Sequence, residues 1–236
     1  DGTLVNSRKE ITPLTLSYLH EIQEKGHIVA LASGRPYPGM KGYAEQLGLD
    51  KMGGYAVSFN GARIISCRDG SAVYEKTMPN HYLKDIYNYA TEHGIGMVTY
   101  KDDMVVTGTR IDDYMEYEAR LNYMPLKHID NFCEEVDFDM VKCLLTAEPE
   151  YAAQCEKELY DMLSPELNVF RSEPYFIEIT MQGVDKAESI DHLLKILDIP
   201  RENSICCGDG FNDLTMVKYA GIGVAMENAQ QIVKDN

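Results

Sequence analysis

Hydrophobic positions in the first sixty residues follow the periods of alternating helices and strands. After Thr12 and Pro13, an N-cap and a first-turn proline, a helix is predicted that ends near Gly26. Its apolar positions are Leu16, Leu19 and Ile22. The run 28–32 (IVALA) is continuously apolar, as in a strand covered on both faces. A second helix ending near Gly48 and a strand at 55–59 complete an order typical of a parallel α/β sheet.

The pattern changes near Ala62. Apolar runs at 63–66 and 72–76 flank the turn sequence CRDGS and predict a hairpin, and 77–80 is predicted to be a linker. The elements predicted next are helix 82–93, strands 97–100 and 104–107, helix 112–120, strand 140–145, helix 150–163, and strands 167–171 and 176–180. Paired strands with helices between them indicate an antiparallel sheet with helices on one face. This segment is therefore predicted to be a separate small domain.

The alternation of predicted helices and apolar strands returns at Gly183. Asp185 precedes a predicted helix whose apolar stripe consists of Ile190, Leu193, Leu194 and Leu197. Strands at 204–207 and 221–226 and a helix from Ala229 follow. The predicted fold class is α/β, with a Rossmann-like parallel-sheet core that an α+β domain interrupts. The predicted bounds are 1–79 and 182–236 for the core and 80–181 for the insertion.

Composition limits the classes of partner. The chain has 236 residues, 44% of them hydrophobic and 25% charged, which are ordinary globular values. A formal charge of −16 argues against nucleic acid, whose binding needs a basic face. No window approaches the roughly 18 consecutive apolar residues of a membrane span, and the start lacks the features of a secretory signal. The six cysteines have no metal-binding spacing, so we expect reduced thiols in a cytoplasmic protein.

Polar clusters follow the predicted core strands. They are Asp1-Gly2-Thr3, Ser33-Gly34-Arg35, Asn60-Gly61 and the run 208–213 (GDGFND). Ligands of open parallel sheets bind outside the carboxyl ends of the strands, so these clusters are expected to share one crevice. Carboxylate oxygens suit Mg²⁺, and Lys186, at the start of a predicted helix, can offset the charge of a phosphate. Ser33, Asn212 and free backbone N–H groups can hold phosphate oxygens. Together, these carboxylate, hydroxyl, amide and ammonium groups indicate phosphoryl transfer.

In combination, these motifs resemble the haloacid dehalogenase-like hydrolase superfamily, and within it the Cof-type phosphatases with an inserted α/β cap. The superfamily pattern contains Asp-Gly-Thr, a Ser or Thr after the second core strand, a Lys that opens a helix, and GDxxND. The matching positions are Asp1-Gly2-Thr3, Ser33, Lys186 and 208–213, and FNGA at 59–62 matches the segment before the cap. The resemblance covers essentially the whole chain.

The resemblance implies a Mg²⁺-dependent phosphatase that hydrolyses small phosphorylated metabolites, such as sugar phosphates or similar monoesters. It implies that Asp1 is the general acid/base and binds the metal through its backbone carbonyl. Asp209 would be a direct metal ligand and Asp213 a direct or water-mediated one. Lys186 would also position the nucleophile. The residues implied to bind the transferring phosphate are Ser33, Gly34, Lys186 and Asn212.

The chain departs from the family pattern at three places. The nucleophilic Asp, which forms an aspartyl-phosphate, is expected two residues before Asp1 and is absent together with its strand. The last helix also stops early, so both ends are expected to be clipped. Cof-type proteins often have Gly-Val-Ser-Lys-Gly where this chain has GVDKA at 183–187, and Asp185 is expected to cap the helix and to have no catalytic role.

Two alternative functions share these residues. A phosphomutase needs a basic patch on the cap for a second phosphate, and the cap cations are sparse, which favours hydrolysis; they include Lys101, Arg110, Arg120 and Lys127. A non-catalytic binding or regulatory protein is the other alternative if the natural chain begins at Asp1. The expected partner is a small phosphorylated metabolite, without nucleic acid or membrane, and the protein is expected to be a monomer or homodimer.

Overall fold

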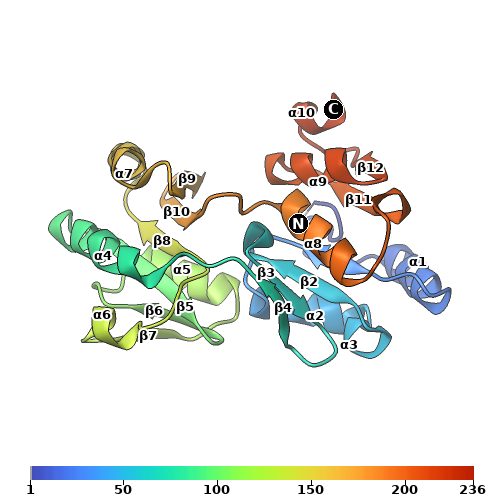
Figure 1. Ribbon diagram of the computed structural model, residues 1–236, viewed down its shortest axis with the longest axis horizontal. Coiled ribbons are helices and arrows are strands. Elements are labelled where there is room, and N and C mark those ends of the chain that lie inside the picture. The colour runs from blue at the N-terminus through green and yellow to red at the C-terminus, as the bar shows by residue number, and fades with distance from the viewer. Residues whose placement is uncertain (1) are drawn as a thin grey trace. The chain divides into compact units, whose positions relative to one another are not determined.

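The computed structural model describes residues 2–236, and these divide into two compact units. The first unit consists of residues 2–75 together with Val184–Asn236, and the second is Lys76–Gly183. The second unit is therefore an insertion into the first, as the colours of Figure 1 show. Each unit has its own strands and its own buried apolar clusters.

The first unit alternates helices and strands in both of its segments (Figure 1). Its elements before the insertion are α1 (Pro13–Glu24), β1 (Ala30–Ala32), α2 (Pro38–Gln46), α3 (Leu49–Met52), β2 (Tyr55–Ser58), the 3-10 turn η1 (Phe59–Gly61), β3 (Arg63–Ser66) and β4 (Ala72–Glu75). Those after it are α8 (Lys186–Ile196), η3 (Arg201–Asn203), β11 (Ile205–Gly208), η4 (Phe211–Asp213), α9 (Leu214–Tyr219), β12 (Ile222–Ala225) and α10 (Gln231–Lys234).

The predicted α/β class is confirmed, because parallel strand pairs form the core of this unit. Strands β1 and β2 are parallel, with Ala30 opposite Tyr55, and β11 and β12 are parallel, with Ile205 opposite Ile222. The predicted hairpin also forms, since β3 pairs antiparallel with both β2 and β4. Within the described residues, β1-β2-β3-β4 form one sheet and β11-β12 another.

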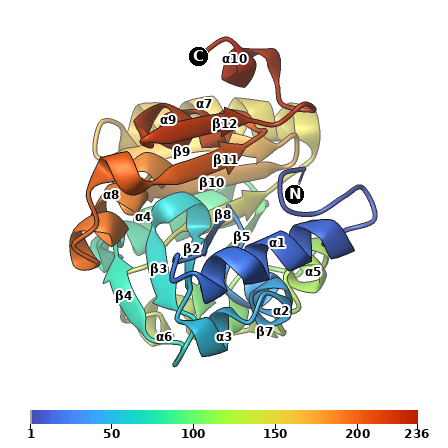
Figure 2. The ribbon, with the colours of Figure 1, turned by 90° about the vertical axis from the view of Figure 1, so that its right-hand side faces the viewer.

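Helices cover both faces of the four-stranded sheet. On one face, Leu31 and Ala56 of the strands pack with Met40 and Ala44 of α2, and α1 adds partly buried apolar side chains. The ribbons of α1 and α2 lie beside each other in Figure 2. On the other face, the buried residues Val57, Ile64 and Leu193 bring α8 against β2 and β3. Strand β2 is buried along Ala56–Ser58, as a strand covered on both faces predicts, whereas in the 28–32 run Leu31 is buried and Ile28 and Ala30 are exposed.

Helix termini in this unit follow the sequence signals. The Thr12 side chain accepts the N–H of Thr15 and caps α1, which Pro13 begins. Asp185 caps α8 in the same way, because its Oδ1 accepts the N–H of Glu188 at 2.8 Å. The structure also contains α3, a helix of four residues directly after Gly48 that the sequence pattern does not indicate.

The second unit contains a six-stranded sheet of order β7-β6-β5-β8-β10-β9. Its elements are η2 (Asn80–Tyr82), α4 (Leu83–Glu92), β5 (Gly96–Lys101), β6 (Met104–Thr107), α5 (Asp113–Leu121), β7 (Leu126–His128), α6 (Phe132–Glu135), β8 (Cys143–Thr146), α7 (Pro149–Leu163), β9 (Leu167–Glu173) and β10 (Phe176–Met181). The sequence pattern does not indicate β7 or α6. Because β7 pairs parallel with β6, the sheet is mixed and not purely antiparallel.

Helices lie on both faces of this sheet, which corrects the expectation of one covered face. Met97, Leu145 and Ile177 point into the large core that α4 and α7 cover. Tyr100 points to the opposite face of β5 from Met97, because the two residues are three positions apart. Its hydroxyl donates to Glu118 of α5 at 2.6 Å. Thus α5 covers part of the second face, whereas α4, α6 and α7 cover the first.

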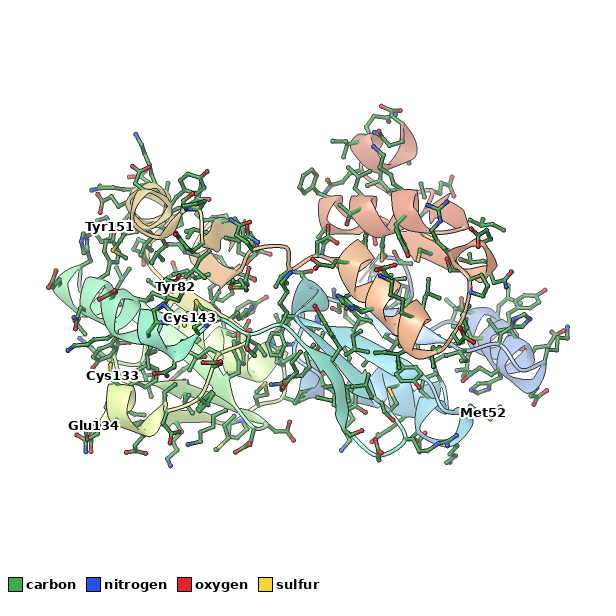
Figure 3. All side chains as sticks on the ribbon, in the orientation of Figure 1. Met52, Tyr82, Cys133, Glu134, Cys143 and Tyr151 are labelled. Carbon is green, nitrogen blue, oxygen red and sulfur yellow. The ribbon has the colours of Figure 1, made fainter. Side chains whose placement is uncertain are left out.

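The segment predicted to be a linker is part of the second unit. Met78 is fully buried in the large core of that unit and forms an isolated bridge with Met140. The Met78 N–H donates to the Met140 carbonyl at 2.7 Å, and the reverse bond is 2.9 Å long. Cys143 of β8, labelled in Figure 3, is buried in the same core. Among the described residues, no helix has both the length and the apolar character needed to cross a membrane.

Candidate active site

The loop at Gly2 and Thr3 lies against the loop that follows β11. Thr3 Oγ1 donates to Asp209 Oδ1 at 2.5 Å across 206 positions of sequence. Gly2 has φ +81°, in the left-handed region, and a Cβ there would collide with the Asp209 carboxylate. Glycine is therefore required for this close approach. Asp1, predicted to be the acid/base and a metal ligand, lies outside the described residues.

Lys186 and Asp213 form a buried ion pair in the first unit. Lys186 Nζ lies 2.5 Å from Asp213 Oδ1, and the two side chains are only 4% and 10% exposed. Asp213 Oδ2 accepts the backbone N–H groups of Asp209 and Gly210, each at 3.0 Å. The carboxylate thus fixes the start of α8 to the 208–213 loop, and both of its oxygens have partners.

The pKa of Asp213 lies below its ordinary value. Burial of the side chain opposes its charge, but the ammonium of Lys186 and the hydrogen bonds from Lys186, Gly210 and Asp209 outweigh that effect. The group is therefore an anion at neutral pH. A carboxylate of this kind organises the loop, because it orients two backbone N–H groups and one ammonium at once.

Ser33, Gly34 and Asn212 meet around the turn η1. Ser33 Oγ accepts the N–H of Arg35 at 3.2 Å, and the Ser33 carbonyl accepts the N–H of Asn60 at 2.9 Å. Asn212 Nδ2 donates to Asn60 Oδ1 at 2.9 Å. A Cβ placed on Gly34 would lie 3.1 Å from Asn60 Nδ2. The structure therefore brings these three predicted residues together through Asn60.

Asn228 is a site residue that the motif search missed. Its Nδ2 donates to the Gly2 carbonyl at 3.1 Å. The backbone on either side of Asn228 binds the 208–213 loop, because the N–H groups of Met226 and Gln230 donate to the carbonyls of Gly208 and Asp209. A cavity of about 410 Å³ lies beside it, lined by Gly2, Val5, Asn6, Ser7, Lys9 and Asn228. Asn228 follows β12, so the search for polar residues after each core strand could have found it if it had been extended to this last strand.

The donor chemistry of this loop fits a hard cation such as Mg²⁺. Asp209 Oδ1 accepts the neutral hydroxyl of Thr3, and the carboxylate stands at the carboxyl end of β11. Asp213 already accepts three hydrogen bonds, which leaves about one of the roughly four acceptor sites of a carboxylate for a further partner. Within residues 2–236, no group of three or more His, Cys, Asp or Glu side chains forms a metal-binding cluster.

A larger hollow lies in the second unit and lacks this chemistry. It has a volume of about 840 Å³ and is bounded by α4, α5, β5 and the start of α7; charged groups at its rim are Arg110, Asp112, Asp113 and Glu148. The Asp112 carboxylate is occupied there, because it accepts the Met115 N–H and the Thr146 hydroxyl. Volume alone is a poor guide here, so we place the candidate active site in the first unit.

Comparison with known proteins agrees with the α/β fold described above. The family described as haloacid dehalogenase-like hydrolase matches residues 1–236. A solved haloacid dehalogenase-like hydrolase from Bacteroides thetaiotaomicron has a TM-score of 0.93 and 40% sequence identity, covering 100% of this chain and 88% of that chain. The similarity therefore extends over both units.

Two curated relatives come from Bacillus subtilis (strain 168). YxeH is 30% identical over 232 residues, which are 97% of this chain and 85% of that protein. The 5-amino-6-(5-phospho-D-ribitylamino)uracil phosphatase YitU is 28% identical over 237 residues, 99% of this chain and 86% of its own length. Each match includes both segments of the first unit and the insertion.

Proposed function

Because the chain belongs to the haloacid dehalogenase-like hydrolase family, we propose that it is a Mg²⁺-dependent phosphatase acting through an aspartyl-phosphate intermediate. The observation that carries the proposal is the linked charge set at the ends of the core strands. There Asp209 and the Asp213–Lys186 ion pair belong to one hydrogen-bonded loop. Phosphoryl transfer depends mainly on positioning and on stabilisation of charge, and such a set is suited to both.

The proposed roles follow from the hydrogen-bond partners. Asp209 would hold Mg²⁺ directly, and Asp213, which already accepts three hydrogen bonds, would hold it directly through its remaining acceptor site or through water. Bound Mg²⁺ supplies neutralisation of phosphate charge. Lys186 contributes a second positive charge, and Asp1 acts as general acid/base and metal ligand. The residues that bind the phosphate are Ser33, Gly34, Lys186 and Asn212.

We propose small phosphate monoesters, such as sugar phosphates, as substrates. The relative YitU is named for a substrate with a phosphate on a ribityl chain, which is an open sugar alcohol. The second unit, Lys76–Gly183, is proposed to be the cap that selects the rest of the substrate. Its separate sheet and core support a unit whose side chains can vary without disturbing the site in the first unit.

We further propose that the enzyme works in the cytoplasm. All six cysteines are free thiols. Burial raises the pKa of Cys67 to about 11 and the pKa of Cys143 to about 12, so both remain protonated at neutral pH. Buried, protonated thiols are inert packing groups, which suits a reducing compartment.

The experiment that tests the function is a phosphate-release assay with a panel of monoesters, performed on the intact natural protein with Mg²⁺ or with EDTA. We expect release that requires Mg²⁺. Asp209→Ala is expected to abolish it, because the variant loses the carboxylate that holds the metal. Asp161→Ala, which removes an exposed carboxylate of α7, is the matched control and is expected to keep full activity.

The same assay separates the alternatives. A phosphomutase would move phosphate between positions of a sugar and release little of it. A binding protein would release none from any monoester. The metal assignment would be wrong if Asp209→Ala retained Mg²⁺-dependent turnover.

A further inference from the structure

The turn η1 has an unusual backbone. Phe59, Asn60 and Gly61 have φ values of +52°, +55° and +111°, all in the left-handed region. Residues other than glycine rarely adopt this region, and a bulky residue such as Phe does so at an energetic cost. The side chain of Phe59 is buried, and packing can hold it in place. Asn is among the non-glycine residues that adopt the left-handed region most often, so position 60 can hold this conformation and still carry a carboxamide.

This turn connects two parts of the candidate active site. The N–H groups of Asn60 and Phe59 donate to the carbonyls of Ser33 and Arg35 at 2.9 and 3.1 Å. On its other side the turn meets the start of α8, because a Cβ on Gly61 would collide with the Asp185 carbonyl. The position of Asn60 is therefore fixed relative to the Ser33 loop and to the helix that Lys186 begins.

The Asn60 side chain lies between two of the proposed phosphate-binding residues. Its Oδ1 accepts a hydrogen bond of 2.9 Å from Asn212 Nδ2 in an exposed position. Its carboxamide also lies beside Gly34, where a Cβ would be 3.1 Å from Nδ2 and 3.2 Å from Oδ1. An amide nitrogen carries two N–H donors, so Asn212 retains one donor after it bonds to Asn60.

We propose that Asn60 is a positioning residue of the phosphate site. It accepts one N–H of Asn212 and thereby directs the other N–H toward a phosphate oxygen. It also keeps an uncharged group beside Gly34, where a carboxylate would repel the phosphate. This inference rests on the proposed function, because it assigns Asn60 a task in the same site.

The test uses Asn60→Gly, because glycine keeps the left-handed backbone and removes only the carboxamide. We expect kcat/KM for the best monoester to fall about five- to tenfold, which corresponds to the loss of one hydrogen bond. The inhibition constant of inorganic phosphate is expected to rise by a similar factor. The unfolding midpoint is not expected to fall. Asp198→Gly is the matched control, since Asp198 also has a left-handed backbone, with φ +53°, and lies in the turn after α8.

A double-mutant cycle tests whether Asn60 acts through Asn212. In an Asn212→Ala background, Asn60→Gly is expected to change kcat/KM less than twofold. The inference is overturned if Asn60→Gly alone changes kcat/KM less than twofold, or if the two substitutions act independently. If the wild type releases no phosphate, the proposed function fails. In that case the wild type, the two single variants and the double variant report the coupling through their affinities for inorganic phosphate, measured by calorimetry. Independent effects of the two substitutions on that affinity also overturn the inference.

Discussion

At the scale of single residues, the site depends on a charge pair that water barely reaches. Transfer of an ammonium and a carboxylate out of water is costly, and their attraction offsets that cost only when further hydrogen bonds satisfy them. Asp213 meets this condition through the amides of Asp209 and Gly210. Removal of Lys186 would leave an uncompensated buried anion at the entrance of α8.

We therefore expect Lys186→Met to lower the free energy of unfolding by about 3 kcal/mol and to abolish phosphate release. Lys195→Met is the matched control in the same helix, because Lys195 pairs with Asp191 at the surface with its side chain 70% exposed. That pair is expected to contribute less than about 0.5 kcal/mol. Urea denaturation of the wild type and the two variants measures the loss in free energy of unfolding for each substitution. Equal losses from the two substitutions would contradict the account of Lys186.

Single residues of the site differ in how far sequence reasoning reaches. Asp209, Asp213 and Ser33 follow apolar runs, and the rule that ligands bind at strand ends locates them. The partnership of Thr3 with Asp209, and of Asn60 with Asn212, joins residues 206 and 152 positions apart. No local pattern encodes such distances, because the packing of helices against the sheet brings these loops together.

At the scale of elements, the N-terminus of α8 couples helix stability to the site. Asp185 caps the helix, and Lys186 is its first residue, so fraying of the first turn would release the ammonium from Asp213. Asp185→Ala is expected to lower the free energy of unfolding by about 1 kcal/mol and to reduce kcat. Asp185→Asn is the control, because it keeps a capping oxygen without the charge, and it is expected to restore both. Thermal unfolding and phosphate release measure the two effects, and equal losses from Ala and Asn would reject capping as the cause.

Elements were predictable where they are long and periodic. The helices at 13–24 and 149–163 have several apolar positions at helical spacing, and both are present near their predicted bounds. Strand β7 has only three residues, two of them exposed, so no alternation marks it. The covering of a second sheet face by α5 also depends on tertiary packing, because Glu118 of α5 is a buried carboxylate whose partner, Tyr100, lies on another element.

At the scale of the whole molecule, the two units have separate buried cores, so we expect each to unfold as a cooperative unit. The second unit has a contiguous core of its own, from Met78 to Ile179. Its two ends also lie near each other, because Lys76 Nζ donates to the Gly183 carbonyl at 3.1 Å. The alternation of helices and apolar strands stops near Ala62 and resumes at Gly183, and this change in the sequence pattern indicated the insertion. The bridge between Met78 and Met140 joins residues 62 positions apart, so the sequence pattern alone does not reveal it.

Residues 76–183 are expected to fold alone, because their buried side chains pack mainly with one another. Circular dichroism of this fragment in urea should show one cooperative transition. The shorter fragment 80–181 lacks Met78, which is fully buried and makes two backbone hydrogen bonds to Met140. Loss of a buried Met side chain alone costs about 2 kcal/mol or more, so the shorter fragment is expected to unfold at lower urea concentration. Equal midpoints for the two fragments would mean that Met78 does not contribute to this core, and the absence of any transition in 76–183 would show that the unit depends on the rest of the chain.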